Sequence, residues 1–513
     1  MAPAEPEVIP VTAPNSSPTL DGLFRRSLDR QHEALALVDP ADKMRVTATP
    51  PLRLTFAQAD RAISALAAHF MGAGLPANSV IAVQLPNTVE FMLTVLAAHR
   101  AGLVVALLPQ LWRQAELTMA LNRTGARAII TTSRIDGVSH ADLAMNAAAE
   151  AFSIRHVCGF GSNLPEGMAS LDDVMAATDF APRPPVTQDA RRAAIISFDV
   201  TAEGFRAVPR THLNLISGGL SVFLESGLPQ GATIMSALTP SSFASVASSL
   251  VIWLLSGGAL ALHHPFDSDV MEAQISELGC DVLVAPAPLT QRLADAGLLD
   301  RAPTLRHVVG LWRAPEQVFT SPHWPSEQAV LTDLYLFGEA GLFGARRGAN
   351  GLPQAVMPGS HGAPRAVASS SIAGEILITP KGTLGLRGPM VPILAYASPV
   401  DPGLSLVPTE RPADHVDTGF AARLDRSTGA ICITAPPSGV LAVGGYRFLA
   451  QDLSEWARRL GPNTMLTALP DRLSGYRLAG RASNNARARD ALIELGLNPL
   501  MVEAFRDRAS VDT

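Results

Sequence analysis

Apolar positions in the first two thirds of the chain alternate between the period of a helix and short continuous runs. Apolar residues recur on one helical face over 56–70, and this segment ends at Gly72 and Gly74. A continuous apolar run over 80–85 predicts a buried strand. The alternation continues with helices predicted over 91–98 and 114–122 and strands over 104–108 and 128–132. Strands that alternate with helices of this length predict parallel βαβ units with both sheet faces covered.

The same alternation predicts a second wound unit over 213–345. An apolar run at 193–196 predicts a strand, and an apolar helix is predicted to begin after Thr211-His212. Further helices are predicted over 246–255 and 270–278, and further strands over 259–263 and 282–285. The chain therefore predicts two doubly wound α/β subdomains.

The pattern changes after residue 372, where short β runs at 374–378 and 430–434 are separated by Pro and Gly. We expect a flexible head at 1–18, a large domain over 19–434 that includes this β-rich lobe, and a hinge at 435–439 (Ala-Pro-Pro-Ser-Gly). A small α+β domain is predicted over 440–513, with a helix that begins after Asn485 and ends near Gly496.

Composition narrows the classes of function that the protein can have. Of the 513 residues, 47% are hydrophobic and 17% are charged, which supplies enough apolar surface for folded domains. A net charge of −6 gives no electrostatic basis for binding nucleic acid. The sequence shows neither a signal peptide nor an apolar run long enough to span a membrane, so we expect a cytoplasmic protein. The expected partners are a small molecule or a protein, with a homodimer left open.

The stretch from 195 to 212 has the strand, loop and helix order of a phosphate-binding loop. Such a loop needs glycines for close backbone approach and a cation for charge. Here it offers one glycine, Gly204, and Arg206 as the cation that a phosphate could use. On the local evidence alone, an ordinary surface turn between strand and helix is the favoured interpretation.

Four short strings then suggest a family. They are Leu54-Thr55-Phe56, Leu85-Pro86-Asn87-Thr88-Val89-Glu90-Phe91, Ala101-Gly102 and Gly444-Gly445-Tyr446-Arg447. In this order and spacing the chain resembles the adenylate-forming superfamily of acyl-CoA synthetases, luciferases and peptide-synthetase adenylation domains over about residues 20–480. The resemblance implies that family's fold and its chemistry, in which a carboxylate and ATP give an acyl-adenylate and pyrophosphate, usually followed by thioester formation.

The resemblance also places the family's phosphate loop on residues 199–207, where only Thr201 is retained. The glycines expected there are absent, and Gly204 stands elsewhere in the loop. Asp199 and Glu203 put carboxylates where triphosphate oxygens would lie, which implies like-charge repulsion. Arg206 stands at the family's Lys position and keeps a donor for phosphate or carboxylate.

The remaining nucleotide motifs are altered in the same direction. The adenine-binding aromatic and its glycine fall on Phe337 and Gly338, but the metal-binding Glu has become Gly341, with Glu339 two residues away. The indole of Trp312, in the family's Gly-Gly-Ala-Pro element, is expected to fill adenine space. The ribose-binding Asp has become Phe420. The catalytic Lys has become Tyr476, with Arg477 as the adjacent cation.

Only 30 positions separate Gly445 from Gly475, fewer than the family uses to build its mobile C-terminal domain. The resemblance therefore implies that the domain at 440–513 is truncated and that its catalytic swing is incomplete.

Three functional hypotheses follow. The first is a pseudoenzyme that keeps the fold, has lost ATP-dependent adenylation, needs no cofactor, and binds an acyl or aryl carboxylate or a partner protein. The second is an active acid:CoA ligase that uses ATP, Mg²⁺ and CoA, with Arg206, Arg477 and Glu339 in the phosphate, carboxylate and metal roles. The third is acyl transfer without ATP, in which His212, Asp199 or Glu203 acts as acid or base.

Overall fold

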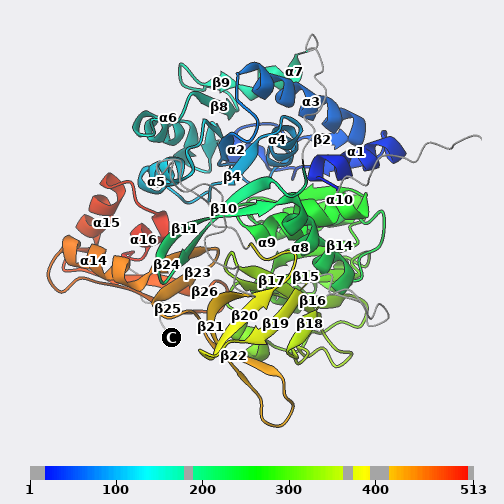
Figure 1. Ribbon diagram of the computed structural model, residues 1–513, viewed down its shortest axis with the longest axis vertical. Coiled ribbons are helices and arrows are strands. Elements are labelled where there is room, and N and C mark those ends of the chain that lie inside the picture. Colours follow the sequence, from blue (N-terminus) through cyan, green and yellow to red (C-terminus); the bar gives the residue numbers. More distant parts are fainter. Residues whose placement is uncertain (1–17, 178–188, 362–373, 393–414, 507–513) are drawn as a thin grey trace, which may run out of the picture.

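The computed structural model describes residues 18–177, 189–361, 374–392 and 415–506. The head predicted at 1–18 lies outside these ranges except for its last residue. Figure 1 shows the N-terminal α/β unit above a second α/β unit, with a small β sheet at the bottom and the C-terminal lobe at one side.

The first unit is a seven-stranded sheet in the order β11-β10-β4-β3-β5-β8-β9, parallel from β10 to β9. Its strands are β3 (Val80–Val83), β4 (Val104–Leu107), β5 (Ala128–Thr132), β8 (His156–Phe160), β9 (Ala169–Ser170), β10 (Ala193–Thr201) and β11 (Gly204–Thr211). Its helices are α3 (Phe56–Gly72), α4 (Val89–Arg100), α5 (Gln114–Thr124), α6 (His140–Glu150) and α7 (Leu171–Ala176). The parallel order confirms the wound unit predicted from the apolar pattern.

Local sequence explains where these elements begin. Thr55 starts α3 through a capping box with Gln58, which satisfies two backbone donors that the helix leaves free. Every residue of α4 is buried, because this helix packs between the two sheets. Gly125 ends α5 in the left-handed conformation that glycine adopts at low cost.

The second unit is an eight-stranded sheet in the order β17-β16-β15-β14-β12-β13-β1-β2. Its strands are β1 (Leu35–Val38), β2 (Arg53–Thr55), β12 (Ile234–Ser236), β13 (Leu260–Leu262), β14 (Val282–Pro286), β15 (His307–Trp312), β16 (Val330–Phe337) and β17 (Gly341–Arg346). Its helical segments are α1 (Leu20–Gln31), α8 (His212–Glu225), α9 (Phe243–Val246), η1 (Ala247–Val251), α10 (Ile252–Ser256), α11 (Ser268–Leu278), α12 (Ala287–Asp295), α13 (Leu298–Arg301) and η2 (Pro315–Thr320). The helix predicted over 246–255 is thus interrupted by one π turn, η1.

The β-rich lobe is a five-stranded antiparallel sheet of β18 (Gly359–His361), β19 (Gly374–Ile378), β20 (Thr383–Arg387), β21 (Val416–Leu424) and β22 (Ile431–Ala435). The predicted hinge at 435–439 falls between β22 and the next hairpin. These findings establish the predicted fold class, two wound α/β units with a β-rich lobe.

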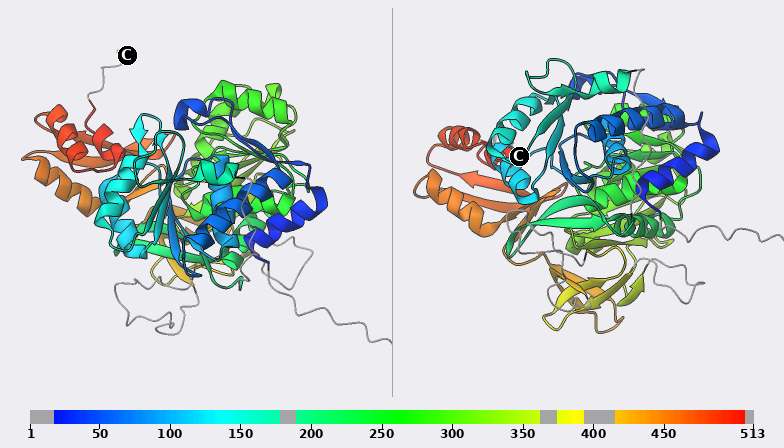
Figure 2. Two further views of the ribbon diagram at one scale, coloured as in Figure 1. Left: turned by 90° about the horizontal axis from the view of Figure 1, so that it is seen from above. Right: turned by 45° about the horizontal axis from the view of Figure 1, so that its top comes forward.

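The C-terminal lobe has a small core of its own. It contains β23 (Val440–Val443), β24 (Tyr446–Leu449), α14 (Ala450–Leu460), β25 (Met465–Asp471), β26 (Gly475–Arg481), α15 (Asn485–Glu494) and α16 (Pro499–Glu503). Leu453, Leu492 and Phe505 are among its buried apolar side chains. Figure 2 shows this lobe beside α5 and the β10–β11 hairpin, and the Tyr446 hydroxyl accepts a hydrogen bond from the backbone N–H of Leu111 at 3.1 Å.

Candidate functional site

The predicted phosphate loop is a β hairpin. β10 and β11 pair from Ala193↔Thr211 to Thr201↔Gly204, so only two residues form the turn. Phe198, Val200 and Phe205 favour strand, and Gly204, at φ +113°, supplies a backbone conformation that other residues rarely adopt. The expected order of strand, loop and helix is therefore wrong, because the chain runs from a strand through a two-residue turn into a second strand and only then into α8.

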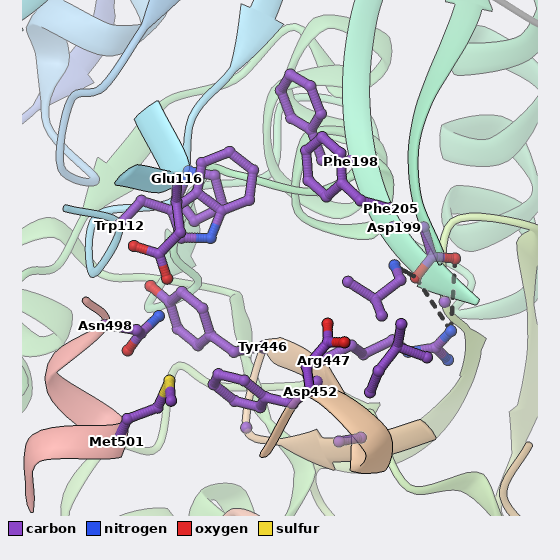
Figure 3. A pocket seen from close by; sticks show the side chains of 18 of the residues that line it. Trp112, Glu116, Phe198, Asp199, Phe205, Tyr446, Arg447, Asp452, Asn498 and Met501 are labelled. Carbon is purple, nitrogen blue, oxygen red and sulfur yellow. Dashed lines mark hydrogen bonds and ion pairs between the residues drawn. The ribbon is translucent and has the colours of Figure 1, made fainter. Parts of the chain in front are cut away.

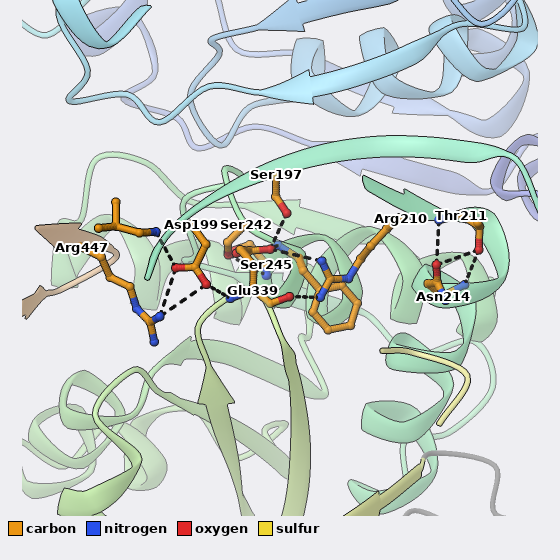
Figure 4. Close-up of polar contacts among 11 residues, drawn as sticks. Ser197, Asp199, Arg210, Thr211, Asn214, Ser242, Ser245, Glu339 and Arg447 are labelled. Carbon is orange, nitrogen blue, oxygen red and sulfur yellow. Dashed lines mark hydrogen bonds and ion pairs between the residues drawn. The ribbon is translucent and has the colours of Figure 1, made fainter. Parts of the chain in front are cut away.

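Asp199, on β10, has its carboxylate fully engaged by protein groups. It accepts hydrogen bonds from the backbone N–H of Val200 and of Glu339, each at 2.9 Å. Arg447 of the C-terminal lobe donates from Nη1 to Oδ1 at 3.1 Å (Figure 4). Both side chains are largely buried, at 9% exposure for Asp199 and 13% for Arg447. This ion pair joins the hairpin to the C-terminal lobe.

The hairpin turn itself faces solvent. Thr201 donates its hydroxyl hydrogen to Glu203 at 2.7 Å. The Arg206 side chain is 56% exposed and lies 3.9 Å from Glu203. The structure therefore places Arg206 and Glu203 on the outside of the hairpin, and brings neither of them to Glu339.

Glu339 is buried beside the hairpin. Its Oε2 accepts from the Ser197 hydroxyl and, at 3.1 Å, from the backbone N–H of Phe243. Arg210 Nη1 lies 3.6 Å from the same oxygen. Burial raises the pKa of Glu339 to about 7, and Arg210 opposes this shift. The carboxylate is held by donors inside the protein, as Figure 4 shows.

The metal-binding position of the motif, Gly341, faces apolar side chains. A Cβ atom built there would lie 3.1 Å from Leu386 Cδ1 and 3.8 Å from Met390 Sδ. Within the described ranges no three His, Cys, Asp or Glu residues are grouped as a metal site. These surroundings do not fit a Mg²⁺ ion, which requires oxygen ligands.

Aromatic side chains fill the neighbouring positions. Phe337, at the end of β16, and Phe420, on β21, meet edge to face with ring centroids 5.3 Å apart. Phe337 also stacks on Phe343 at 5.4 Å. Both Phe337 and Phe420 are buried. The two residues that the resemblance places at adenine and at ribose thus contact each other.

Gly338 allows the ion pair to approach the backbone. It has φ +56°, and a Cβ atom there would lie 2.3 Å from Arg447 Nη1 and 2.6 Å from Asp199 Oδ2. Only a glycine fits between this turn and the pair without displacing it.

Trp312 lies differently from the expectation that it fills adenine space. Its indole N–H donates to Asp333 Oδ1 at 2.7 Å, and Asp333 also pairs with Arg347 at 2.9 Å. The indole therefore belongs to the polar core of the second sheet. The next residue, Arg313, lines the large cavity described below.

The C-terminal hairpin reaches η2. The carbonyl of Gly475 accepts a hydrogen bond from the Gln317 side-chain amide at 3.4 Å, and the Tyr476 side chain lies close to Glu316. Arg477 faces Asp471 on its own hairpin, whose carboxyl pKa it helps to lower. Arg206, Arg477 and Glu339, expected to share a site, are thus on separate parts of the molecule.

The acid–base hypothesis for His212 finds no support in its surroundings. The side chain is completely buried, and its Nδ1 accepts a hydrogen bond from the backbone N–H of Leu20 at 3.3 Å. It packs edge-on against His99 at 4.7 Å. Burial lowers the pKa of His212 to about 2, so the ring is neutral. Its role is structural.

A cavity of about 370 Å³ lies between the hairpin, α5 and the C-terminal lobe (Figure 3). Trp112, Phe198 and Phe205 form one aromatic wall, with centroids 5.2 to 5.8 Å apart. Glu116 on α5 and Tyr446 on β24 also line it. Local sequence patterns do not mark these residues as a site, because they come together only through packing between segments far apart in the chain.

A model of the AMP-binding enzyme family matches residues 24–391. The chain belongs to this family. Its fold is similar to that of the apo structure of MbtA from Mycobacterium smegmatis, with a TM-score of 0.67, 21% identity, and 95% of this chain and 90% of that chain covered. It is also similar to the amide bond synthetase McbA from Marinactinospora thermotolerans, with a TM-score of 0.68, 16% identity and coverage of 93% and 94%.

Curated relatives are similar over shorter stretches. The medium-chain fatty-acid–CoA ligase of Escherichia coli is 26% identical over 178 residues, which are 34% of this chain and 31% of that protein. The salicyl-AMP ligase/salicyl-S-ArCP synthetase of Mycobacterium tuberculosis is 25% identical over 198 residues, 38% of this chain and 34% of that protein. The match thus spans about a third of the length of each relative.

Within the described ranges, no helix is both long and apolar enough to cross a membrane.

Proposed function

We propose that this family member does not activate carboxylates with ATP and acts as a ligand-binding protein. The observation that carries the proposal is the ion pair between Asp199 and Arg447, which occupies the position that the resemblance assigns to the phosphate loop. A triphosphate there would have to displace Arg447 from Asp199 and leave that carboxylate facing phosphate oxygens.

The other positions support the same proposal. Phe337 and Phe420 contact each other where the resemblance places adenine and ribose. A side chain at position 341 would meet apolar side chains, and the Glu339 carboxylate already accepts hydrogen bonds from Ser197 and from a backbone N–H. These residues do not fit a magnesium-bound nucleotide, so we derive no reaction step through one.

Calorimetric titration of the full chain with Mg·ATP tests this proposal. We expect no binding at millimolar nucleotide and no acid-dependent release of pyrophosphate across a panel of alkyl and aryl acids. Micromolar binding of Mg·ATP would overturn it.

The second candidate is a divergent carboxylic acid–CoA ligase, which the names of the curated relatives favour. It requires Arg206 to turn from solvent toward the cavity, since the side chain is 56% exposed and, among the residues that the structure describes, forms an ion pair only with Glu203. Acid-dependent pyrophosphate release that is lost in Arg206→Ala, and kept in the matched exposed variant Arg423→Ala, would establish this candidate.

A further inference from the structure

The cavity between the hairpin and the C-terminal lobe has acidic and aromatic walls. Four carboxylates line it, against two guanidinium groups, Arg313 and Arg447; the carboxylates belong to Glu116, Asp199, Glu339 and Asp452. Arg447 is committed to Asp199, and Glu339 lies beside Arg210. This leaves Glu116 and Asp452 against Arg313, so the lining carries one excess negative charge when both of these carboxyl groups are ionised.

Two of these carboxylates form no ion pair with another residue that the structure describes. Among the described residues, neither Glu116 on α5 nor Asp452 on α14 forms an ion pair with an Arg, Lys or His side chain. Figure 3 shows both carboxylates pointing into the cavity from opposite sides. Glu116 comes from the N-terminal unit and Asp452 from the C-terminal lobe, so a ligand between them would contact both parts of the protein.

The aromatic rings are placed for a flat ligand that carries positive charge. Phe198 and Phe205 stack at 5.4 Å with planes 14° apart, and Trp112 lies at 5.2 Å and 5.8 Å from them. Tyr446 and Trp456 of the C-terminal lobe also line the cavity. The faces of aromatic rings attract cations, and Trp does so most strongly. A volume of about 370 Å³ suits a small organic molecule.

We infer that this cavity binds an organic cation, a protonated or quaternary amine on an aromatic or flat apolar body, between Glu116, Asp452 and the ring wall. This inference rests on the proposed function. It names an amine as the ligand, whereas the sequence predicted an acyl or aryl carboxylate. The negatively charged lining would repel a carboxylate ligand, whereas it would form ion pairs with a protonated or quaternary amine.

The environment of Glu116 supports the inference. Burial raises the pKa of Glu116 to about 7, and hydrogen bonds from the Arg113 backbone N–H and from Asn498, with the charge of Arg113, only partly offset this. The Tyr446 hydroxyl also faces this group from β24. A bound cation would favour the ionised form of Glu116, so binding and proton release are linked.

Calorimetry with three probes that differ in charge tests the inference. The probes are 1-naphthylmethylammonium, 1-naphthalenemethanol and 1-naphthoate, titrated into the nucleotide-free protein. We expect the cation to bind at least about tenfold more tightly than the other two, with affinity rising from pH 6 to pH 8 as Glu116 ionises. Glu116→Gln should weaken binding of the cation by about tenfold and reduce its pH dependence, and Asp452→Asn should also weaken binding.

Asp490→Asn is the matched control, because Asp490 is an acid on α15 outside the cavity; it should leave binding unchanged. Equal binding of the alcohol, tighter binding of the naphthoate, or no binding of any probe at millimolar concentration would overturn the inference. Each of these results would leave the proposed loss of ATP use standing, whereas Mg·ATP binding would overturn that proposal separately.

Discussion

Arg447 Nη1 lies 3.1 Å from Asp199 Oδ1, although the two residues are 248 positions apart in the chain. The pair connects a hairpin of the first sheet to the C-terminal lobe, so it fixes the position of that lobe in this structure.

Removing the cation should loosen the lobe. We expect Arg447→Met to lower the free energy of unfolding by about 2 kcal/mol, because Asp199 would stay buried with only backbone donors. Urea denaturation measures this loss, and small-angle scattering should show a larger radius of gyration. Arg206→Met, on the same hairpin but exposed, should cost less than about 0.5 kcal/mol. Equal effects of the two variants would contradict a structural role for the pair.

Gly338→Ala should show how much stability is lost when a Cβ atom collides with the Asp199–Arg447 pair, beyond the loss caused by backbone strain at a positive φ. The added Cβ would collide with Arg447 and Asp199, so we expect a loss of about 3 kcal/mol in thermal unfolding. Gly231→Ala is the control, because Gly231 also has a positive φ, +77°, but no atom lies within 4 Å of the position that its Cβ would take; this variant should lose about 1 kcal/mol. If the Gly338→Ala protein were as stable as the control, the ion pair would move away from the new Cβ atom without lowering the free energy of unfolding.

Restoring the family's carboxylate at position 420 should not restore nucleotide binding. Phe420→Asp would bury a carboxylate against Phe337 and remove the ring that the Arg447 guanidinium covers at 5.7 Å, and we expect it to lower stability by about 4 kcal/mol. Phe420→Leu keeps an apolar side chain and should cost about 1 kcal/mol. The measurement is the urea midpoint together with an Mg·ATP titration; a stable Phe420→Asp protein that binds nucleotide would refute the assignment of Phe420 to the core.

Glu116 should make stability depend on pH in a defined window. In the folded protein the pKa of Glu116 is raised from 4.5 to about 7. Between these two pH values the folded state therefore binds more protons than the unfolded state. Stability consequently falls as the pH rises from about 4.5 to about 7. Glu116→Gln keeps the capping box on α5 and removes the titration. The stability of this variant relative to the natural protein should therefore rise by an amount on the order of 2 kcal/mol from about pH 4.5 to about pH 7.5. If the free energies of unfolding of the two proteins changed with pH in parallel, Glu116 would not be the group that titrates in this window.

The order of elements could be predicted because each has its own local pattern. β5 lies at 128–132 as predicted, since five buried apolar and Thr residues are enough to define a central strand. The helix after residue 485 begins at Asn485, capped by Asn484. In both cases the information is contained within a few neighbouring residues.

The candidate site could be predicted only in part. Comparison with the family located the altered positions, and Phe337 and Phe420 proved to be in contact. The hairpin was missed because the comparison assigned a loop where alternating aromatic residues favour strand. The Arg447 contact and the cavity around Trp112 depend on packing between segments far apart in sequence, which no local pattern encodes. The shorter C-terminal domain and the cytoplasmic location stay predictions.

β1 pairs with β13, so the first strands of the chain complete the second sheet before residues 56–211 build the first one. In the order of the polypeptide, the first unit is therefore nested inside the second, as a guest domain within a host. A fragment that starts at residue 213 lacks one edge of its own sheet, and the apolar face of α10 that Phe24 covers would be open to water. Expression of the second unit as an independent piece thus requires residues 18–55 to be joined to it, for example as a circular permutant.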